Sequence, residues 1–315
     1  MPSDWTFVSV DMELTNLCSS DCLMCPRDAI YRPKGFMPED VFEVVSKKLV
    51  SEGSLITFSG MGDPLSHPKV FEWIYDIRQR GGDVGIVVNP TSLGRDSSRK
   101  LVEAGPNSIT LSFPSVQRGV FERLCPRVSF EDALERAREL IDRAIGKVGL
   151  RVLGIVTAIN REESDEYVRF WEGMGVPSSM TLCHGRGGNL EAPGIYEPKS
   201  VEFKSGKCGL FQFHTFVTWE GDVLACCHDL TGDTQIGNLV NDHVYVIAER
   251  KRKIMCDYVS FPLCRKCDEP LRQHFPPHDS PPANRKERNR FFRALNYDAQ
   301  KASQFRYKNV IHPSS

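Results

Sequence analysis

Residues 7–25 read FVSVDMELTNLCSSDCLMC. The first part, FVSVDMEL, predicts a β-strand because β-branched and apolar residues dominate it. The strand runs directly into Cys18, Cys22 and Cys25, which are separated by three and then two residues. Three thiolates on one loop can converge on one metal centre, and three ligands leave one iron of a four-iron cluster unligated. A zinc knuckle or three buried thiols are the alternatives.

The same alternation of apolar runs and amphipathic stretches continues along the chain. Six strand–helix repeats favour an α/β fold with a parallel sheet, curved as a partial (β/α)6 barrel. In such folds the chemistry lies at the carboxyl ends of the strands. The predicted strands are residues 7–14, 54–60, 84–89, 108–113, 150–159 and 180–184, and the predicted helices are residues 37–53, 70–82, 97–105, 120–124, 130–146 and 163–175.

The pattern changes near residue 190, so we predict three parts. Residues 1–190 form the barrel, and residues 191–270 form a separate module in which six of the eleven cysteines lie. Residues 271–315 form a tail, in which 285–308 have the pattern of a basic amphipathic helix. A packing or solvated role is the simplest interpretation of that helix.

Composition excludes several classes of protein. The 315 residues carry 40 basic and 41 acidic side chains, so no electrostatic stripe for a nucleic acid is expected. No run approaches the roughly 18 apolar residues of a membrane span, and the N-terminus lacks a signal-peptide pattern. We therefore expect a cytoplasmic protein without nucleic-acid or membrane partners. In a reducing compartment, eleven cysteines point to metal or redox chemistry rather than to disulfides.

A second group of cysteines follows residue 207. Cys208 and Cys226 flank a hairpin that turns at Gly221, and Cys264 and Cys267 form a CxxC pair. Together these four thiolates can hold one further iron–sulfur cluster. A structural zinc site needs the same number of ligands, so spacing alone leaves zinc open.

The first cysteine group resembles the signature of the radical S-adenosylmethionine (radical SAM) superfamily, Cys-x3-Cys-x2-Cys after the first strand of a partial (β/α)6 barrel. The resemblance covers about the first 190 residues. It implies a [4Fe-4S] cluster on Cys18, Cys22 and Cys25 with S-adenosyl-L-methionine beside it. The turn at residues 59–64, SGMGDP, is similar to the superfamily's Gly-Gly-Glu-Pro turn, with Asp63 where Glu is usual. A Gly-rich turn alone would be a weak signal.

The same resemblance implies which residues contact S-adenosylmethionine. Met24 corresponds to a position near the adenine, and the turn corresponds to the segment that holds the amino group. Polar residues at the ends of the third and fourth strands correspond to positions that meet the ribose and carboxylate. The implied contacts are Met24, Gly60, Met61, Gly62, Asp63, Asn89 and Ser112.

The second cysteine group resembles the twitch domain, a shortened SPASM domain that binds a single auxiliary [4Fe-4S] cluster. The resemblance implies that Cys208, Cys226, Cys264 and Cys267 hold this cluster, which gives two [4Fe-4S] clusters per chain. The full SPASM form has further C-terminal cysteines, and this chain has none after Cys267.

For the reaction, the resemblance implies that an external reductant of flavodoxin or ferredoxin type supplies one electron and that a 5′-deoxyadenosyl radical removes a substrate hydrogen. The combination of a barrel with a twitch module is most similar to the aminoglycoside-tailoring members of the superfamily. These include neomycin C epimerase and a dehydrogenase of 2-deoxystreptamine biosynthesis. Cys256 favours the epimerase, in which a thiol returns hydrogen to the opposite face of a sugar carbon. The alternative is a dehydrogenase that oxidises a carbinol of an aminocyclitol or aminoglycoside. Cys256 as a spare buried thiol stays open.

Two other classes of protein are alternatives. Peptide-modifying members usually carry a recognition domain ahead of the barrel, and because the cysteine loop here begins at residue 18, we expect none in this chain. A non-enzymatic iron–sulfur protein would release no 5′-deoxyadenosine from S-adenosylmethionine and a reductant.

Several further residues are candidates for minor roles. Cys125 is expected to pack in the core, Cys183 to lie near the barrel mouth, and Cys227 to face away from Cys226 by strand alternation. A polycationic aminoglycoside needs carboxylates, and surface solvation is the other role for each candidate. The candidate carboxylates are Glu13, Asp229 and Asp233, and the candidate substrate contacts after the sixth strand are His184, Arg186 and Asn189.

Overall fold

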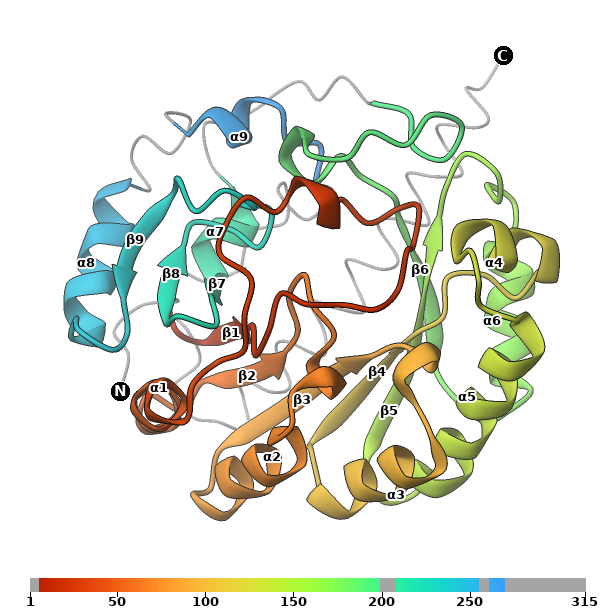
Figure 1. The fold of residues 1–315 in the computed structure, drawn as a ribbon, viewed down its shortest axis with the longest axis horizontal. Coiled ribbons are helices and arrows are strands. Elements are labelled where there is room, and N and C mark those ends of the chain that lie inside the picture. Colours follow the sequence, from red (N-terminus) through yellow and green to blue (C-terminus); the bar gives the residue numbers. More distant parts are fainter. Residues whose placement is uncertain (1–5, 199–207, 255–260, 270–315) are drawn as a thin grey trace.

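The predicted strands form one open sheet in the computed structural model, which describes residues 6–198, 208–254 and 261–269 (Figure 1). Strands β1 to β6 pair in sequence order and all in parallel, which confirms the predicted α/β fold with a parallel sheet. β6 and β9 are the edge strands of the described sheet. The first six strands are β1 (Ser9–Met12), β2 (Leu55–Phe58), β3 (Asp83–Val88), β4 (Ser108–Ser112), β5 (Gly149–Val156) and β6 (Ser178–Leu182).

Helices cover the outer side of this curved sheet, and the loop after β1 crosses its open inner side (Figure 1). The α-helices of this half are α1 (Glu39–Ser51), α2 (Val70–Gln79), α3 (Arg95–Ala104), α4 (Arg118–Leu124), α5 (Phe130–Ala144) and α6 (Ser164–Glu172). In the part of the chain that the structure describes, short 3-10 helices lie in the loops, namely η1 (Arg27–Ala29), η2 (Pro64–Ser66), η3 (Pro90–Ser92) and η4 (Arg186–Gly188).

Local sequence explains where these helices begin and end. The Ser129 side chain accepts a hydrogen bond from the backbone N–H of Asp132 at 3.3 Å and so caps the start of α5. The buried residues of α5 recur at helical spacing, which turns one face to the sheet. α3 ends at Gly105, whose φ of 70° is accessible to glycine without steric cost.

The segment after residue 207 continues the same sheet. β7 (His214–Val217) pairs in parallel with the free side of β1, and β8 (Asp222–Leu224) and β9 (Gln235–Asn238) follow in antiparallel order. The short α7 (Gly209–Phe213), α8 (Val244–Ile254) and α9 (Pro262–Arg265) complete the described chain. The barrel and the cysteine-rich segment therefore share backbone hydrogen bonds, which the sequence did not indicate. The domain boundaries at residues 190 and 270 stay predictions.

Two expectations fall on residues outside the described ranges. These are the role of Cys256 and the helix at 285–308. Among the described helices, none combines the length and the apolar character needed to span a membrane.

An aromatic cluster fills the core between β4, α4 and α6. Phe113 packs edge-on against Trp171 and lies 4.8 Å from Phe121 between ring centroids. Tyr167 is fully buried beside this cluster, and its hydroxyl donates a 2.8 Å hydrogen bond to the Phe113 carbonyl. The ring of Tyr167 also fills the space where a side chain at Gly154 would lie. Tyr167 thus joins α6 to the ends of β4 and β5.

We predict that Tyr167→Phe destabilises the fold, because it leaves the buried Phe113 carbonyl without its donor. The expected loss in free energy of unfolding is about 1–3 kcal/mol, which lowers the melting midpoint by roughly 2–6 °C. Circular dichroism melts under anaerobic conditions measure this. The control is Tyr245→Phe on α8, where the tyrosine is 56% exposed, and equal midpoints for both variants would contradict the prediction.

Candidate active site

One cavity lies at the carboxyl ends of the parallel strands. Its volume is about 260 Å³, and the loop after β1, the turn after β2 and the ends of β3, β4, β5 and β6 contribute to its lining. All three cysteines of the loop and all seven residues expected to contact S-adenosylmethionine line it, namely Cys18, Cys22, Cys25, Met24, Gly60, Met61, Gly62, Asp63, Asn89 and Ser112. The structure therefore brings the whole predicted first site together, although the contacts themselves stay predictions.

A buried ion pair holds the turn after β2. Glu13 follows β1, is fully buried, and accepts two hydrogen bonds from the guanidinium of Arg32, at 2.9 and 3.2 Å. The same carboxylate accepts a 3.2 Å hydrogen bond from the backbone N–H of Met61. Gly60 has a φ of 124°, and a Cβ there would meet the Glu13 side chain at 2.9 Å. Glu13 was a candidate for the substrate pocket, but it does not line the described cavity and instead fixes the turn.

Polar side chains link that turn to the end of β3 and to the cysteine loop. Asp63 caps η2 and accepts a 3.2 Å hydrogen bond from the Asn89 amide. Asn89 in turn accepts hydrogen bonds from the backbone and hydroxyl of Thr91, and the Thr91 hydroxyl lies 2.8 Å from that of Ser20. Burial raises the pKa of Asp63, while its hydrogen bonds act in the opposite direction. The shorter Asp63 thus has a side-chain role, which is to join two elements of the cavity wall.

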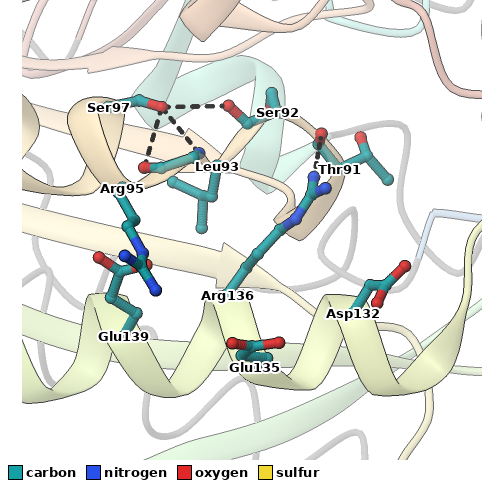
Figure 2. Close-up of a pocket in the computed structure, with 10 residues that line it drawn as sticks. Thr91, Ser92, Leu93, Arg95, Ser97, Asp132, Glu135, Arg136 and Glu139 are labelled. Atoms are coloured by element: carbon teal, nitrogen blue, oxygen red, sulfur yellow. Dashed lines mark hydrogen bonds between the residues drawn. The ribbon is translucent and has the colours of Figure 1, made fainter.

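A second hollow, of about 570 Å³, is lined by residues of η3, α3 and α5 and of the loop between η3 and α3 (Figure 2). In it, Arg136 reaches from α5 and donates hydrogen bonds to the carbonyls of Thr91, at 2.9 Å, and Pro90, at 3.4 Å. The remaining charged lining residues come from α3 and α5, and no cysteine lines the hollow. Arg136 therefore supports the backbone that carries Asn89, and we assign no ligand to this hollow.

All three thiols of the cysteine loop have raised pKa values. Burial raises the pKa of Cys18, and it raises that of Cys25 to about 11, with the nearby Arg186 charge opposing the shift at Cys25. The Cys22 sulfur lies 3.5 Å from that of Cys125, and this contact, followed by burial, raises the pKa of Cys22. Thiols with raised pKa values are neutral, so a bound metal must displace their protons. Cys125 is buried in the core as expected, and its contact with Cys22 was not foreseen.

Three of the four cysteines of the second group, Cys208, Cys226 and Cys267, have recorded contacts or charge interactions that relate them. Cys208 and Cys226 pack against the same small apolar cluster. Contact with Cys227, followed by burial, raises the pKa of Cys226 well above its usual range, and Cys267 adds to this. The expectation that Cys227 faces away from Cys226 is wrong, because β8 ends at Leu224 and strand alternation does not extend to these residues. Cys264 lies on α9.

Two residues near these cysteines reach the barrel. His228 and Glu269 follow Cys226 and Cys267 by two positions each. A Glu269 oxygen lies 2.9 Å from the Nε2 atoms of both His184 and His228, so it joins the end of β6 to the cysteine-rich segment. The His contacts hold the pKa of Glu269 well below its usual range against the effect of burial. The sequence analysis did not predict this group. The Cys-x-His spacing from Cys226 to His228 and the Cys-x-Glu spacing from Cys267 to Glu269 are the sequence features that could have indicated it.

The other two candidate carboxylates, those of Asp229 and Asp233, accept hydrogen bonds from residues of their own loop. The Asp229 carboxylate accepts hydrogen bonds from three backbone N–H groups of its own loop, those of Thr231, Gly232 and Thr234. Asp233 is exposed and accepts a hydrogen bond from the Thr231 hydroxyl. Neither residue lines the described cavity. Arg186, in contrast, does line it, as the sequence suggested for a substrate contact.

Comparison with known proteins agrees with this geometry. Residues 12–170 match the sequence profile of the Radical SAM superfamily. The chain belongs to this superfamily. Residues 208–268 match SPASM, an iron–sulfur cluster-binding domain. Radical SAM membership brings S-adenosylmethionine and a [4Fe-4S] cluster, and the SPASM match brings further iron–sulfur binding.

Curated relatives match about half of this radical SAM chain. The cofactor-modifying protein of the tungsten-containing aldehyde ferredoxin oxidoreductase of Pyrococcus furiosus is 26% identical over 177 residues, which are 54% of this chain and 49% of the relative. A probable GTP 3′,8-cyclase of Saccharolobus solfataricus is 25% identical over 165 residues, 52% of each chain. The chain thus spans about half the length of these relatives.

Solved structures share the fold. BtrN in complex with AdoMet and 2-DOIA has a TM-score of 0.58 and 18% identity, covering 84% of this chain and 94% of BtrN. SuiB of Streptococcus suis, bound to the precursor peptide SuiA, has a TM-score of 0.66 and 14% identity, covering 83% and 70%. Native anSMEcpe with bound AdoMet has a TM-score of 0.63 and 15% identity, covering 93% and 99%. At these identities the similarity concerns the fold alone.

We predict that Gly62→Ala weakens binding of S-adenosylmethionine about tenfold. A Cβ at Gly62 would lie 2.2 Å from the Thr15 carbonyl oxygen and 2.7 Å from that of Leu17, so the turn must move away from the cysteine loop. Equilibrium binding and release of 5′-deoxyadenosine by the reconstituted enzyme measure the effect. Gly119→Ala is the control, because no atom lies within 4 Å of its new Cβ. Unchanged affinity in Gly62→Ala would refute this role of the turn.

We also predict about eight irons per chain, held by a three-thiol and a four-thiol set. Replacing Cys18, Cys22 and Cys25 together by Ala should leave about four irons and abolish cleavage of S-adenosylmethionine. Single Ala variants of the second set should keep the first cluster. Iron, zinc and sulfide analysis of anaerobic protein measures this, and four irons with one zinc would remove the auxiliary cluster.

Proposed function

We propose that this radical SAM enzyme is an epimerase that inverts a carbon of a hydroxylated ring such as a sugar or cyclitol, with hydrogen returned from the Cys256 thiol. The observation that supports a radical reaction in this cavity is that the three loop cysteines and the seven expected S-adenosylmethionine contacts line it together. When bound, S-adenosylmethionine and a reduced [4Fe-4S] cluster supply a 5′-deoxyadenosyl radical that takes a hydrogen atom from a substrate C–H bond.

Different residues of the chain have different roles in this proposal. The Glu13–Arg32 pair and Asp63 keep the turn after β2 and the end of β3 in register with the cysteine loop. The β5 and β6 side of the cavity, with Gly154 and Thr181, is left for the substrate. Cys256 donates a hydrogen atom to the opposite face of the substrate carbon, and the sulfur radical left behind takes up one electron and one proton. An external reductant of flavodoxin or ferredoxin type supplies the electrons.

The substrate expected from the resemblance, an aminoglycoside such as neomycin C, gains no support from the cavity. Its described lining offers a single carboxylate, that of Asp63, which already accepts hydrogen bonds from Asn89 and Leu65. A polycation needs several carboxylates that are free to meet it. The ligands in the similar solved structures do not indicate one substrate class either, because 2-DOIA is bound in one structure and a precursor peptide in another. We therefore propose a hydroxylated ring as the substrate and assign no amino groups to it.

A dehydrogenase is the second candidate, and one observation favours it. The His184–Glu269–His228 contacts connect the end of β6 to the segment that carries Cys226 and Cys267. Oxidation of a carbinol radical needs a nearby electron acceptor and a path for a proton, and this group can supply the proton path beside an auxiliary cluster.

Anaerobic turnover in deuterated water separates the two reactions. Candidate sugars, cyclitols and aminoglycosides are incubated with the reconstituted enzyme, S-adenosylmethionine and a reductant, and product mass and stereochemistry are followed together. An epimerase places one deuterium at the inverted carbon, because thiols exchange their hydrogen with solvent. A dehydrogenase gives a product that is lighter by two hydrogens.

Cys256→Ala should still form 5′-deoxyadenosine but should fail to invert the substrate. Cys183→Ala is the matched control, since Cys183 is a buried thiol at the end of β6 that the proposal does not use. Full inversion by Cys256→Ala would exclude Cys256 as the donor and make Cys183 the next thiol to test.

A further inference from the structure

Arg186 lines the cavity, and its guanidinium has no direct partner among the described residues. Asp63 and Arg186 are the only charged residues other than cysteines in the cavity's described lining. The hydrogen bonds that Arg186 makes to other described residues come from its backbone, whose N–H donates to His184 at 3.3 Å and whose carbonyl accepts from Asn189 at 2.8 Å. Within the described residues, no carboxylate forms an ion pair with its guanidinium. A half-buried guanidinium is costly unless something occupies its five donors.

The backbone around Arg186 is held in an unusual conformation. Arg186 has a φ of 49°, which is uncommon for a residue other than glycine, and Gly187 and Gly188 follow with φ of 70° and 86°. The turn is fixed from the cysteine-rich segment, because the Asp268 carboxylate accepts a 2.7 Å hydrogen bond from the N–H of Gly185. Strained backbone of this kind persists where surrounding contacts enforce it and concentrates at ligand sites.

The ionisable groups around Arg186 have other contacts or other expected roles. Glu269 is held by His184 and His228, at 2.9 Å each. Cys25 belongs to the predicted ligand set of the first cluster, and Cys227 contacts Cys226 and lies 3.6 Å from the His228 ring. These groups lower the cost of a positive charge at Arg186 through longer-range attraction. None of them forms a hydrogen bond or an ion pair with the guanidinium, so its planar set of donors can still bind an anion.

Arg186 comes from a different element of the fold than the expected S-adenosylmethionine contacts. Those contacts lie on the cysteine loop and at the ends of β2, β3 and β4, whereas Arg186 follows β6. We propose that Arg186 binds an anionic group of the substrate, a carboxylate or a phosphate, so that the substrate is an acidic or phosphorylated sugar or cyclitol. This inference rests on the proposed function, because it assigns a substrate class to the same cavity.

Binding by the reconstituted holoenzyme tests the proposal. Calorimetric titrations in the presence of S-adenosylmethionine compare D-glucuronate and glucose 6-phosphate with D-glucose and D-glucosamine. The wild type should bind at least one anionic sugar about 10- to 100-fold more tightly than both of the others, as a charge-assisted, bidentate contact implies. Arg186→Gln should lose this preference, and Arg186→Lys should keep part of it. Arg99→Gln, on the exposed surface of α3, is the control that should change nothing.

A wild type that shows no preference for either anionic sugar over the neutral and cationic ones would overturn the proposal. So would an Arg186→Gln variant that keeps the preference. An Arg186→Gln variant in which only the KM for S-adenosylmethionine rises would also overturn it, because the partner of Arg186 would then be the carboxylate of S-adenosylmethionine. Iron content and melting midpoint show whether the variants are folded. Failure to release 5′-deoxyadenosine in the wild type would refute the proposed function instead, and the binding titrations would still be interpretable.

Discussion

The parallel pairing of β1 to β6 is the constraint on which the candidate site depends. Parallel strands in one sheet end at the same edge, so residues that are far apart in sequence come together there. The cysteine loop follows β1, the turn at Gly60 follows β2, Asn89 follows β3, and Ser112 ends β4. Their common cavity is a direct consequence of that arrangement.

The buried Glu13–Arg32 pair turns this general arrangement into a defined one. Both charges are removed from water, so each depends on the other, and loss of one partner of such a pair typically costs about 3–5 kcal/mol. Because Glu13 also holds the N–H of Met61, the energy of the pair is coupled to the shape of the turn. The contacts of Asp63, Asn89, Thr91 and Ser20 add neutral and charge-assisted hydrogen bonds around the same wall. All of these contacts are made between protein atoms, so they define the cavity wall themselves.

The cysteine-rich segment contacts the end of β6 beside the site. β7 continues the sheet from β1, and Asp268 and Glu269, directly after Cys267, contact Gly185 and the two histidines at the end of β6. Contacts of the two residues that follow Cys267 thus connect the second cysteine group to the turn that carries Arg186.

The sequence by itself determined the six strands, the helices between them and the first cysteine group. These features are local, because strand and helix periodicity and the spacing of three cysteines on one loop are set by neighbouring residues. The tertiary structure decided the rest. It paired β7 with β1, because the sequence of a strand does not specify which other strand will lie beside it. It directed Glu13 to Arg32 rather than to a substrate, and it placed Cys227 against Cys226, because β8 ends before both. It also joined Glu269 to two histidines from different parts of the chain, a contact that arises only when the end of β6 and the CxxC segment meet in space.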